Sequence, residues 1–144
     1  MASVKMYTGL EGQVLNFQEG ATSGSFQDGD LVRTDTAGQV VLATAGNIVG
    51  IARKGYTGTQ GTLIPVELLN FNEIYVIPYK AAETALTVVG VALDLVFTAG
   101  AQNATDASTT TLEVECVGLH PADAVGTSGG RLLVRFKPGV INAR

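Results

Sequence analysis

Charge is scarce in this sequence. Lys, Arg, Asp and Glu make up 15% of the 144 residues, while hydrophobic residues make up 46%; an ordinary soluble domain has about 25% charged residues. A folded chain with so few charges is expected to have much of its surface covered by other protein. The net charge is -4, and no run of basic residues is longer than Arg53-Lys54. This argues against nucleic acid as a partner, because affinity for a phosphate backbone comes from clustered Lys and Arg.

Cysteine, tryptophan and long apolar runs are scarce or missing as well. The single cysteine, Cys116, excludes an intrachain disulfide and a multi-cysteine metal site, and is expected to be a buried structural thiol. The most apolar stretch, 85–97, is interrupted by Gly90 and Asp94 and falls short of the ~18 residues of a membrane span. The first nine residues also lack the apolar block of a secretory signal. We therefore expect no membrane partner and assembly in the cytoplasm.

What the sequence does contain is a series of short runs rich in Val, Ile, Leu and Thr. Five of them follow one another between Asp28 and Pro78, separated by Gly, Asn, Asp and Thr: 28–35, 38–44, 47–54, 62–69 and 73–78. This arrangement predicts antiparallel strands joined by tight turns. Both faces of these runs are partly apolar, as expected for a closed barrel or for a sandwich that also meets another subunit.

The rest of the chain continues the pattern. Further strands are expected at 91–98, 110–117 and 131–137, with a polar loop at 99–109 and the best helical candidate at 80–86. Pro65 has no N–H to donate, so its strand is expected at a sheet edge or at a bulge. The sequence thus predicts an all-β body with little helix, over residues 28–144, built as a compact antiparallel β-barrel or sandwich.

Residues 1–27 differ from this body. They form a polar stretch rich in Gly and Ser, with isolated apolar residues that include Leu10, Val14, Leu15 and Phe17. Such a stretch cannot build a core of its own. It is expected to be an extended N-terminal arm, ordered where a neighbour offers pockets or an open sheet edge. The alternative is an arm that folds back as an edge strand on its own body.

Several residues invite a catalytic interpretation. The run from Gly126 to Gly130 resembles the surroundings of the nucleophilic serine in trypsin-like proteases, and Ser128, His120 and Asp123 lie near it in sequence. A catalytic triad, however, needs a pocket and an oxyanion hole as well. Nothing in the sequence supplies either, so a hairpin turn is the preferred interpretation.

The paired carboxylates and the glycines do not indicate a catalytic, metal-binding or nucleotide-binding site either. Glu113 and Glu115 share one strand face and are expected on a solvated or interface face, while Asp28 and Asp30 are expected to cap a turn. The glycines lack the spacing of a nucleotide-binding loop. We expect no enzymatic activity, no metal and no cofactor. The loop from Gly55 to Gly61, around Tyr56, is a candidate binding tip.

The order of these features resembles the head decoration proteins of tailed bacteriophages, also called capsid cement proteins. The resemblance covers most of the chain. It is carried by the polar arm, by Asp28-Gly-Asp-Leu-Val, by Asn47-Ile-Val-Gly-Ile-Ala, by Tyr75-Val-Ile-Pro and by residues 123–136. The segment 80–110 has no counterpart in the smallest of those proteins.

The resemblance implies a β-tulip-like body that assembles as a homotrimer at three-fold or quasi-three-fold positions on the outer surface of the capsid. Its arm would grip the major capsid protein, through Leu10, Val14, Leu15 and Phe17. The apolar strand faces at Val49 and Ile51, or at Ile77 and Tyr79, would form the trimer interface. Such a protein is made in the host cytoplasm and stabilises the expanded shell. The alternative is another structural component of the virion, such as a tail, fibre or host-adhesion module whose loop from Gly55 to Gly61 binds a receptor.

Overall fold

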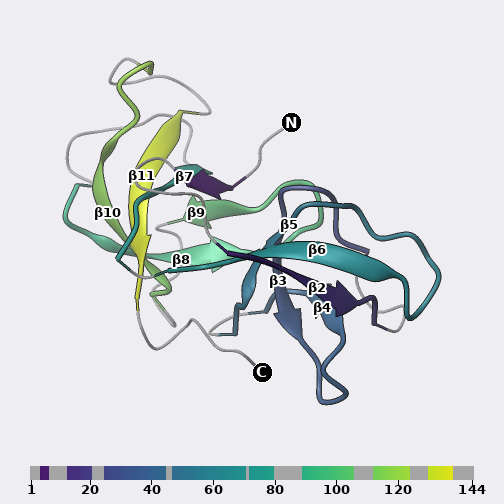
Figure 1. The fold of residues 1–144 in the computed structure, drawn as a ribbon. Coiled ribbons are helices and arrows are strands. Elements are labelled where there is room, and N and C mark those ends of the chain that lie inside the picture. Colours follow the sequence, from purple (N-terminus) through teal and green to yellow (C-terminus); the bar gives the residue numbers. More distant parts are fainter. Residues whose placement is uncertain are drawn as a thin grey trace.

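The computed structural model describes residues 4–6, 13–20, 25–44, 47–70, 72–79, 89–105, 112–123 and 130–137. These residues form eleven strands in two antiparallel sheets, which confirms the all-β class (Figure 1). The six-stranded sheet has the order β1 (Lys5–Met6), β7 (Tyr75–Pro78), β11 (Arg131–Phe136), β10 (Val114–Leu119), β8 (Ala92–Val96) and β9 (Asn103–Thr105). The five-stranded sheet has the order β2 (Val14–Gln18), β6 (Leu63–Leu68), β5 (Gly50–Ala52), β3 (Leu31–Thr34) and β4 (Val40–Leu42). A helix with the length and apolarity to cross a membrane is not found in the described part of the chain.

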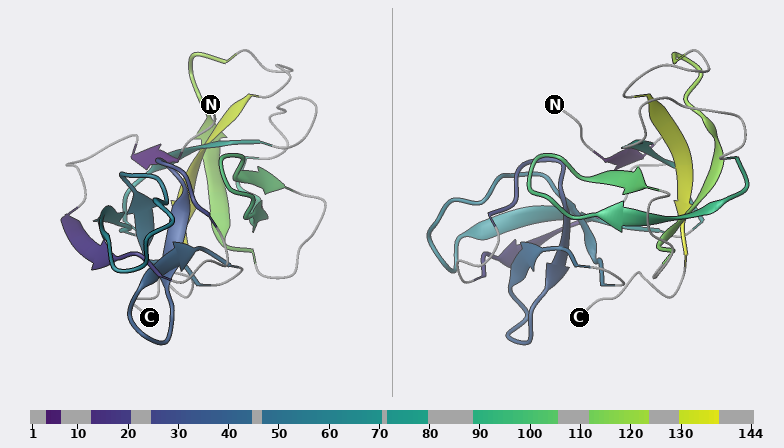
Figure 2. Two further views of the ribbon diagram at one scale, coloured as in Figure 1. Left: turned by 90° about the vertical axis from the view of Figure 1, so that its right-hand side faces the viewer. Right: turned by 180° about the vertical axis from the view of Figure 1, so that it is seen from behind.

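The two sheets pack against each other and each of them curls, as the two views in Figure 2 show. In the five-stranded sheet a parallel bridge between Glu19 and Val40 brings its two edges together at one end. In the six-stranded sheet a parallel bridge joins Tyr79, just after β7, to Ala104 of the edge strand β9. Each joint is a single bridge. The fold is therefore a sandwich of two curled sheets and not the closed barrel that was the other expectation.

Two hydrophobic cores result from this curling. The first core lies within the six-stranded sheet and between the sheets, and its largest fully buried side chains are Leu31, Ile48, Ile51, Tyr75, Ile77, Leu93, Leu132 and Phe136. The second core lies inside the curled five-stranded sheet and consists of Phe26, Val32, Val40, Val49, Ala52, Ile64 and Val66, with Phe17, Leu42, Tyr56 and Leu68 packed against it. Adjacent residues of β3 serve different cores, because Leu31 belongs to the first and Val32 to the second.

Burial in the two cores argues against the predicted trimer interface. Val49 is buried in the second core, and Ile51, Ile77 and Tyr79 are buried in the first. These four side chains have at most 6% of their surface exposed to another copy of the chain. The strands are apolar on both faces because both faces are buried within a single chain.

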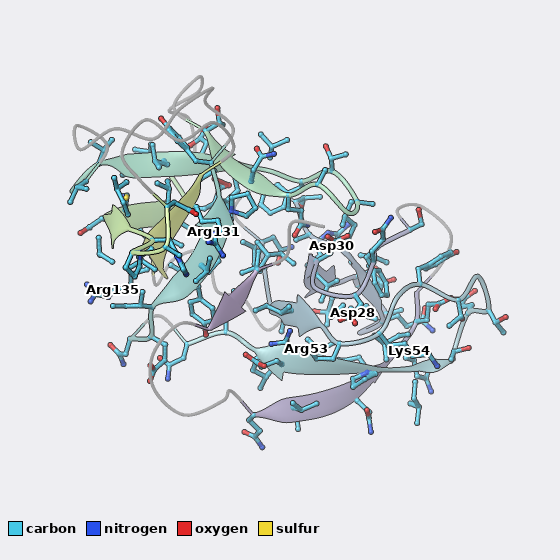
Figure 3. All side chains as sticks on the ribbon, turned by 90° about the horizontal axis from the view of Figure 1, so that it is seen from above. Asp28, Asp30, Arg53, Lys54, Arg131 and Arg135 are labelled. Carbon is cyan, nitrogen blue, oxygen red and sulfur yellow. The ribbon has the colours of Figure 1, made fainter. Side chains whose placement is uncertain are left out.

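Polar side chains tie the sheets together. Gln102, which is buried just before β9, accepts a hydrogen bond from the N–H of Leu31 and donates from Nε2 to the Leu31 carbonyl (3.0 Å). Asp30 Oδ2 accepts from the N–H of Gln27 (2.8 Å) and from the N–H of Gly100 (2.8 Å). Asp30 thus caps its turn as predicted and also fixes the loop between β8 and β9. Figure 3 shows Asp28 and Asp30 near the middle of the molecule.

Most predicted strands are confirmed, but two positions differ. Pro65 lies in β6, which is covered by β2 on one side and β5 on the other. Its carbonyl accepts from the N–H of Arg53 (2.8 Å), one residue beyond the end of β5, so the missing proline N–H falls at the end of the ladder. β9 lies within the stretch predicted to be a polar loop. The helical candidate at 80–86 lies outside the described residues.

The described parts of residues 1–27 lie on the body. β1 pairs with β7, and β2 pairs with β6 in the register Val14 to Glu67 through Gln18 to Leu63. Val4 and Phe26 are buried. In this structure the N-terminal region therefore supplies an edge strand to each sheet, which is the alternative that the sequence left open. Whether the region also reaches a neighbour stays a prediction.

Candidate interaction surface

Three exposed apolar side chains of the described residues lie on the last two strands of the five-stranded sheet. Leu63 is 57% exposed, Val14 50% and Leu15 40%. Leu63 is on β6, and the other two are on β2, the last strand of that sheet. We call this group, with Asn16, the β2 border. Elsewhere, only Val89 and Val91, each 41% exposed, are comparable within the described chain.

The register explains why these side chains stay exposed. Paired residues point to the same face of a sheet. Leu15 and Phe17 pair with Val66 and Ile64, so they lie on the face of the second core, but at its rim. Phe17 packs against that core and is half-buried, whereas Leu15 extends past it.

On the opposite face of β2, Val14 pairs with Glu67. Glu67 is buried, and its Oε1 accepts hydrogen bonds from the Arg53 guanidinium, including one from Nε (3.2 Å). The ion pair neutralises the carboxylate next to Val14. The β2 border consequently carries no net charge, and burying it against protein would not strand an unpaired ion.

The residues predicted for the arm are thus only partly brought together. Val14 and Leu15 are exposed on opposite faces of β2, Phe17 packs against the second core, and Leu10 lies outside the described residues. Leu63, which sequence reasoning missed, lies on the same sheet face as Val14 but pairs with Gln18, at the other end of β2. The residues around Leu63 in the sequence did not indicate that its side chain is exposed. Exposure along β6 depends on its pairing with β2, which is distant in sequence.

The loop from Gly55 to Gly61 does not present its tyrosine freely. The Tyr56 ring packs edge-to-face on Phe26, with 5.8 Å between ring centroids and an interplanar angle of 77°. Glu19, which is fully buried, accepts from the N–H of Thr57 (2.6 Å) and from its hydroxyl (2.8 Å). The loop is therefore anchored at two points. Sequence reasoning missed Glu19, since a lone glutamate in a polar stretch gives no signal of burial.

The residues of the protease-like interpretation have other structural roles. His120 Nδ1 accepts from the N–H of Ala122 (3.1 Å). Asp123 binds Arg131 through three hydrogen bonds, two from the guanidinium (2.9 and 3.0 Å) and one from the main-chain N–H (2.8 Å). Arg131 lowers the pKa of Asp123 to about 2. Asp123 thus fixes the start of β11, and Ser128 lies outside the described residues.

The other polar candidates are structural too. Glu113 is buried and accepts from the N–H of Leu95 (3.0 Å), whereas Glu115 is exposed, so they do not share the solvated or interface face that was expected. Burial raises the pKa of Asp30, against the effect of its two main-chain hydrogen bonds. Groups of three or more His, Cys, Asp or Glu arranged to hold a metal ion are not found among the described residues.

One hollow of about 280 Å³ is lined by Arg33, Thr34, Asp35, Thr36 and Asn47. Among described residues, Arg33 Nε and Asn47 Oδ1 have no hydrogen-bond partner, but both atoms are buried beneath the surface that a water molecule touches. A ligand in the hollow would not reach them. The β2 border is therefore the feature of the described chain best suited to contact another molecule. The chain matches no protein-family model, no curated protein and no solved structure with which it was compared.

Proposed function

We propose that this chain is a structural protein of a bacteriophage virion, a decoration or cement protein that binds the outside of the capsid as a homotrimer and stabilises the expanded shell. The observation that carries the proposal is the β2 border, an uncharged apolar strand edge on a chain with only 15% charged residues. Decoration requires a surface that is covered by neighbouring protein and does not require catalysis.

The thermodynamics of such a role are simple. A protein that binds the expanded shell better than other states of the capsid stabilises that state by linkage. Many identical sites on one shell multiply a small free energy of binding per site. A modest apolar contact, of the size that Val14, Leu15 and Leu63 provide, is therefore sufficient.

The homotrimer has less support than the capsid contact. Val49, Ile51, Ile77 and Tyr79 are buried within the chain, so the trimer rests on the resemblance to decoration proteins and its interface is not assigned. A tail, fibre or adhesion module remains the alternative. The anchoring of Tyr56 on Phe26 makes the loop from Gly55 to Gly61 a less flexible receptor-binding tip than the sequence suggested.

The test is binding of the purified chain to expanded capsids of its phage, measured by co-sedimentation. The double variant Val14→Lys/Leu15→Lys should lose binding, because two ammonium groups would have to be buried in the contact. The matched control is Val89→Lys/Val91→Lys, which adds the same charge at the other exposed valines and should bind like the unchanged chain. If Val14→Lys/Leu15→Lys bound capsids as well as the control variant, the role of the β2 border would be refuted. An image of the virion with the chain on the tail would refute decoration itself.

A further inference from the structure

The outer face of β10 and β11 carries two exposed side chains of opposite charge. Glu115 and Arg135 are Cα partners in the ladder, and paired residues point to the same face of a sheet. Both are exposed, whereas the next pair of the ladder, Cys116 and Val134, is buried in the first core on the other face. Figure 3 shows Arg135 at the periphery of the molecule, on the opposite side of the view from Lys54. The face that Glu115 and Arg135 share is therefore open to another molecule.

Neither of these two charges is paired within the described part of the chain. On the same strand, the Arg131 guanidinium is neutralised by Asp123 (2.9 Å). Glu115 and Arg135, by contrast, make no ion pair and no side-chain hydrogen bond with any described residue. One free anion and one free cation, side by side, are therefore what this face presents to a partner.

Next to the two charges the face is apolar and has a gap in its side chains. A β-bulge at Val117 shifts the register of β10, so that Gly118 is the partner of Leu133 on β11. Gly118 has no side chain, and Leu133 Cδ1 lies 3.8 Å from the place that a Cβ would take there. The Leu133 side chain thus reaches across toward β10, and it is only partly buried. Apolar surface is therefore left along the line between the two strands.

We propose that this face packs against the same face of a second copy of the chain, across a two-fold axis that runs parallel to the strands and between β10 and β11. The rotation places β10 of each copy over β11 of the other. Arg135 of each copy then faces Glu115 of the other, and the two Leu133 side chains meet near the axis. The contact is self-complementary, as a two-fold interface requires.

Charge complementarity favours a second copy over an acidic or a basic partner. A partner of one charge would attract one of Glu115 and Arg135 and repel the other, whereas the rotation exchanges the two and makes two attractive contacts. Lys137 fits the same arrangement, because its N–H donates to the Glu113 carbonyl (3.0 Å) and the rotation turns it toward a carboxylate residue. The contact involves two strands, so it is small and the association is expected to be weak and reversible. The inference goes beyond the proposed function, because it needs no capsid.

The test is an exchange of charges in the full chain, followed by sedimentation equilibrium. The unchanged chain should form dimers as its concentration rises. Arg135→Glu and Glu115→Arg should each weaken dimer formation at least tenfold, because the two attractive contacts become repulsive. An equimolar mixture of the two variants should dimerise again, since each copy offers the charge that the other lacks. Recovery in the mixture would also show that both variants are folded.

A matched pair of leucine variants tests the centre of the contact. Leu133→Ala should weaken the dimer, whereas Leu63→Ala, at an exposed leucine of β6, should leave it unchanged. A chain that stays monomeric at every concentration would overturn the inference, and so would a mixture that associates no better than either charge variant alone. A trimer that neither charge variant weakens would overturn it as well and leave the proposed function intact. Failure to bind capsids would count against the proposed function alone, so the two failures are distinguishable.

Discussion

Glu19 and Thr57 are 38 positions apart in sequence, and one carboxylate oxygen of Glu19 accepts both the main-chain N–H (2.6 Å) and the hydroxyl (2.8 Å) of Thr57. The main chain of Glu19 is used as well. Its carbonyl accepts from the N–H of Gly61 (2.8 Å), and its N–H donates to the Thr62 carbonyl. A single buried residue just after β2 therefore holds the middle and the β6 end of the loop between β5 and β6.

Replacing Glu19 with Ala should lower the free energy of unfolding by about 1–3 kcal/mol, because the N–H and hydroxyl of Thr57 lose their partner. Urea denaturation measures this. Glu19→Gln is the control, since its amide oxygen can still accept both hydrogen bonds, and it should lie between Glu19→Ala and the unchanged chain. A Glu19→Ala chain as stable as the unchanged chain would contradict the role assigned to the carboxylate.

Two glycines should respond differently to alanine. A Cβ at position 50 would overlap the main-chain oxygen of Glu67 and lie 2.7 Å from Val66 Cγ1, so β5 and β6 would have to separate. Gly50→Ala should therefore cost about 3 kcal/mol or more. Gly38 has φ +76° and open space within 4 Å of the place that a Cβ would take, so Gly38→Ala should cost only about 1 kcal/mol, from the left-handed backbone. Thermal unfolding of both variants checks the order, and equal losses would refute the close approach of the strands.

The Asp123–Arg131 pair should make stability depend on acidity. Hydrogen bonds from the Arg131 side chain, with a smaller contribution from its main-chain N–H, lower the pKa of Asp123 from 3.8 to about 2. The folded state thus favours the carboxylate, and the stabilisation is fully present above about pH 4 and lost as the pH falls toward 2. The carboxyl carbon resonance of Asp123 reports its titration directly. Asp123→Asn should remove this part of the pH dependence of unfolding, and an unchanged acid profile in that variant would contradict the assignment.

Cys116 should be inert in the folded protein. Burial raises the pKa of its thiol, so little thiolate is present at neutral pH, and the sulfur is also inaccessible. A thiol-reactive disulfide reagent should label Cys116 only as fast as the chain unfolds. A cysteine placed at exposed position 14 should react at once in the same sample. Rapid labelling of Cys116 in the native chain would contradict the burial of its thiol in β10.

The sequence was a good guide to where strands occur, because strand signals are local. Alternating Val, Ile and Leu between Gly and Asn predicted β3 to β7, and Arg131 to Lys137 predicted β11. β9 was missed because Asn103, Ala104 and Thr105 have no apolar pattern. Their pairing with β8 comes from the tertiary structure and not from local preference.

The faces of the strands were harder to predict. The apolar residues on both sides of 47–54 and 73–78 suggested a second subunit, because sequence alone does not reveal how many cores a chain builds. The curl of the sheets supplies a second core within the same chain, and that core takes Val49. The buried carboxylates Glu19, Glu67 and Glu113 were likewise out of reach, since each depends on a partner distant in sequence. The β2 border was half-predicted, through Val14 and Leu15, and completed by Leu63.

β3 has both faces buried, with Leu31 in one core and Val32 in the other. Its edges are also occupied, by β4 and β5 along the ladder and by Gln102 at Leu31. Neither sheet can unfold without exposing apolar side chains of β3 that pack in the two cores. Heating should therefore produce a single cooperative heat-absorption peak, and the two sheets behave as one thermodynamic unit.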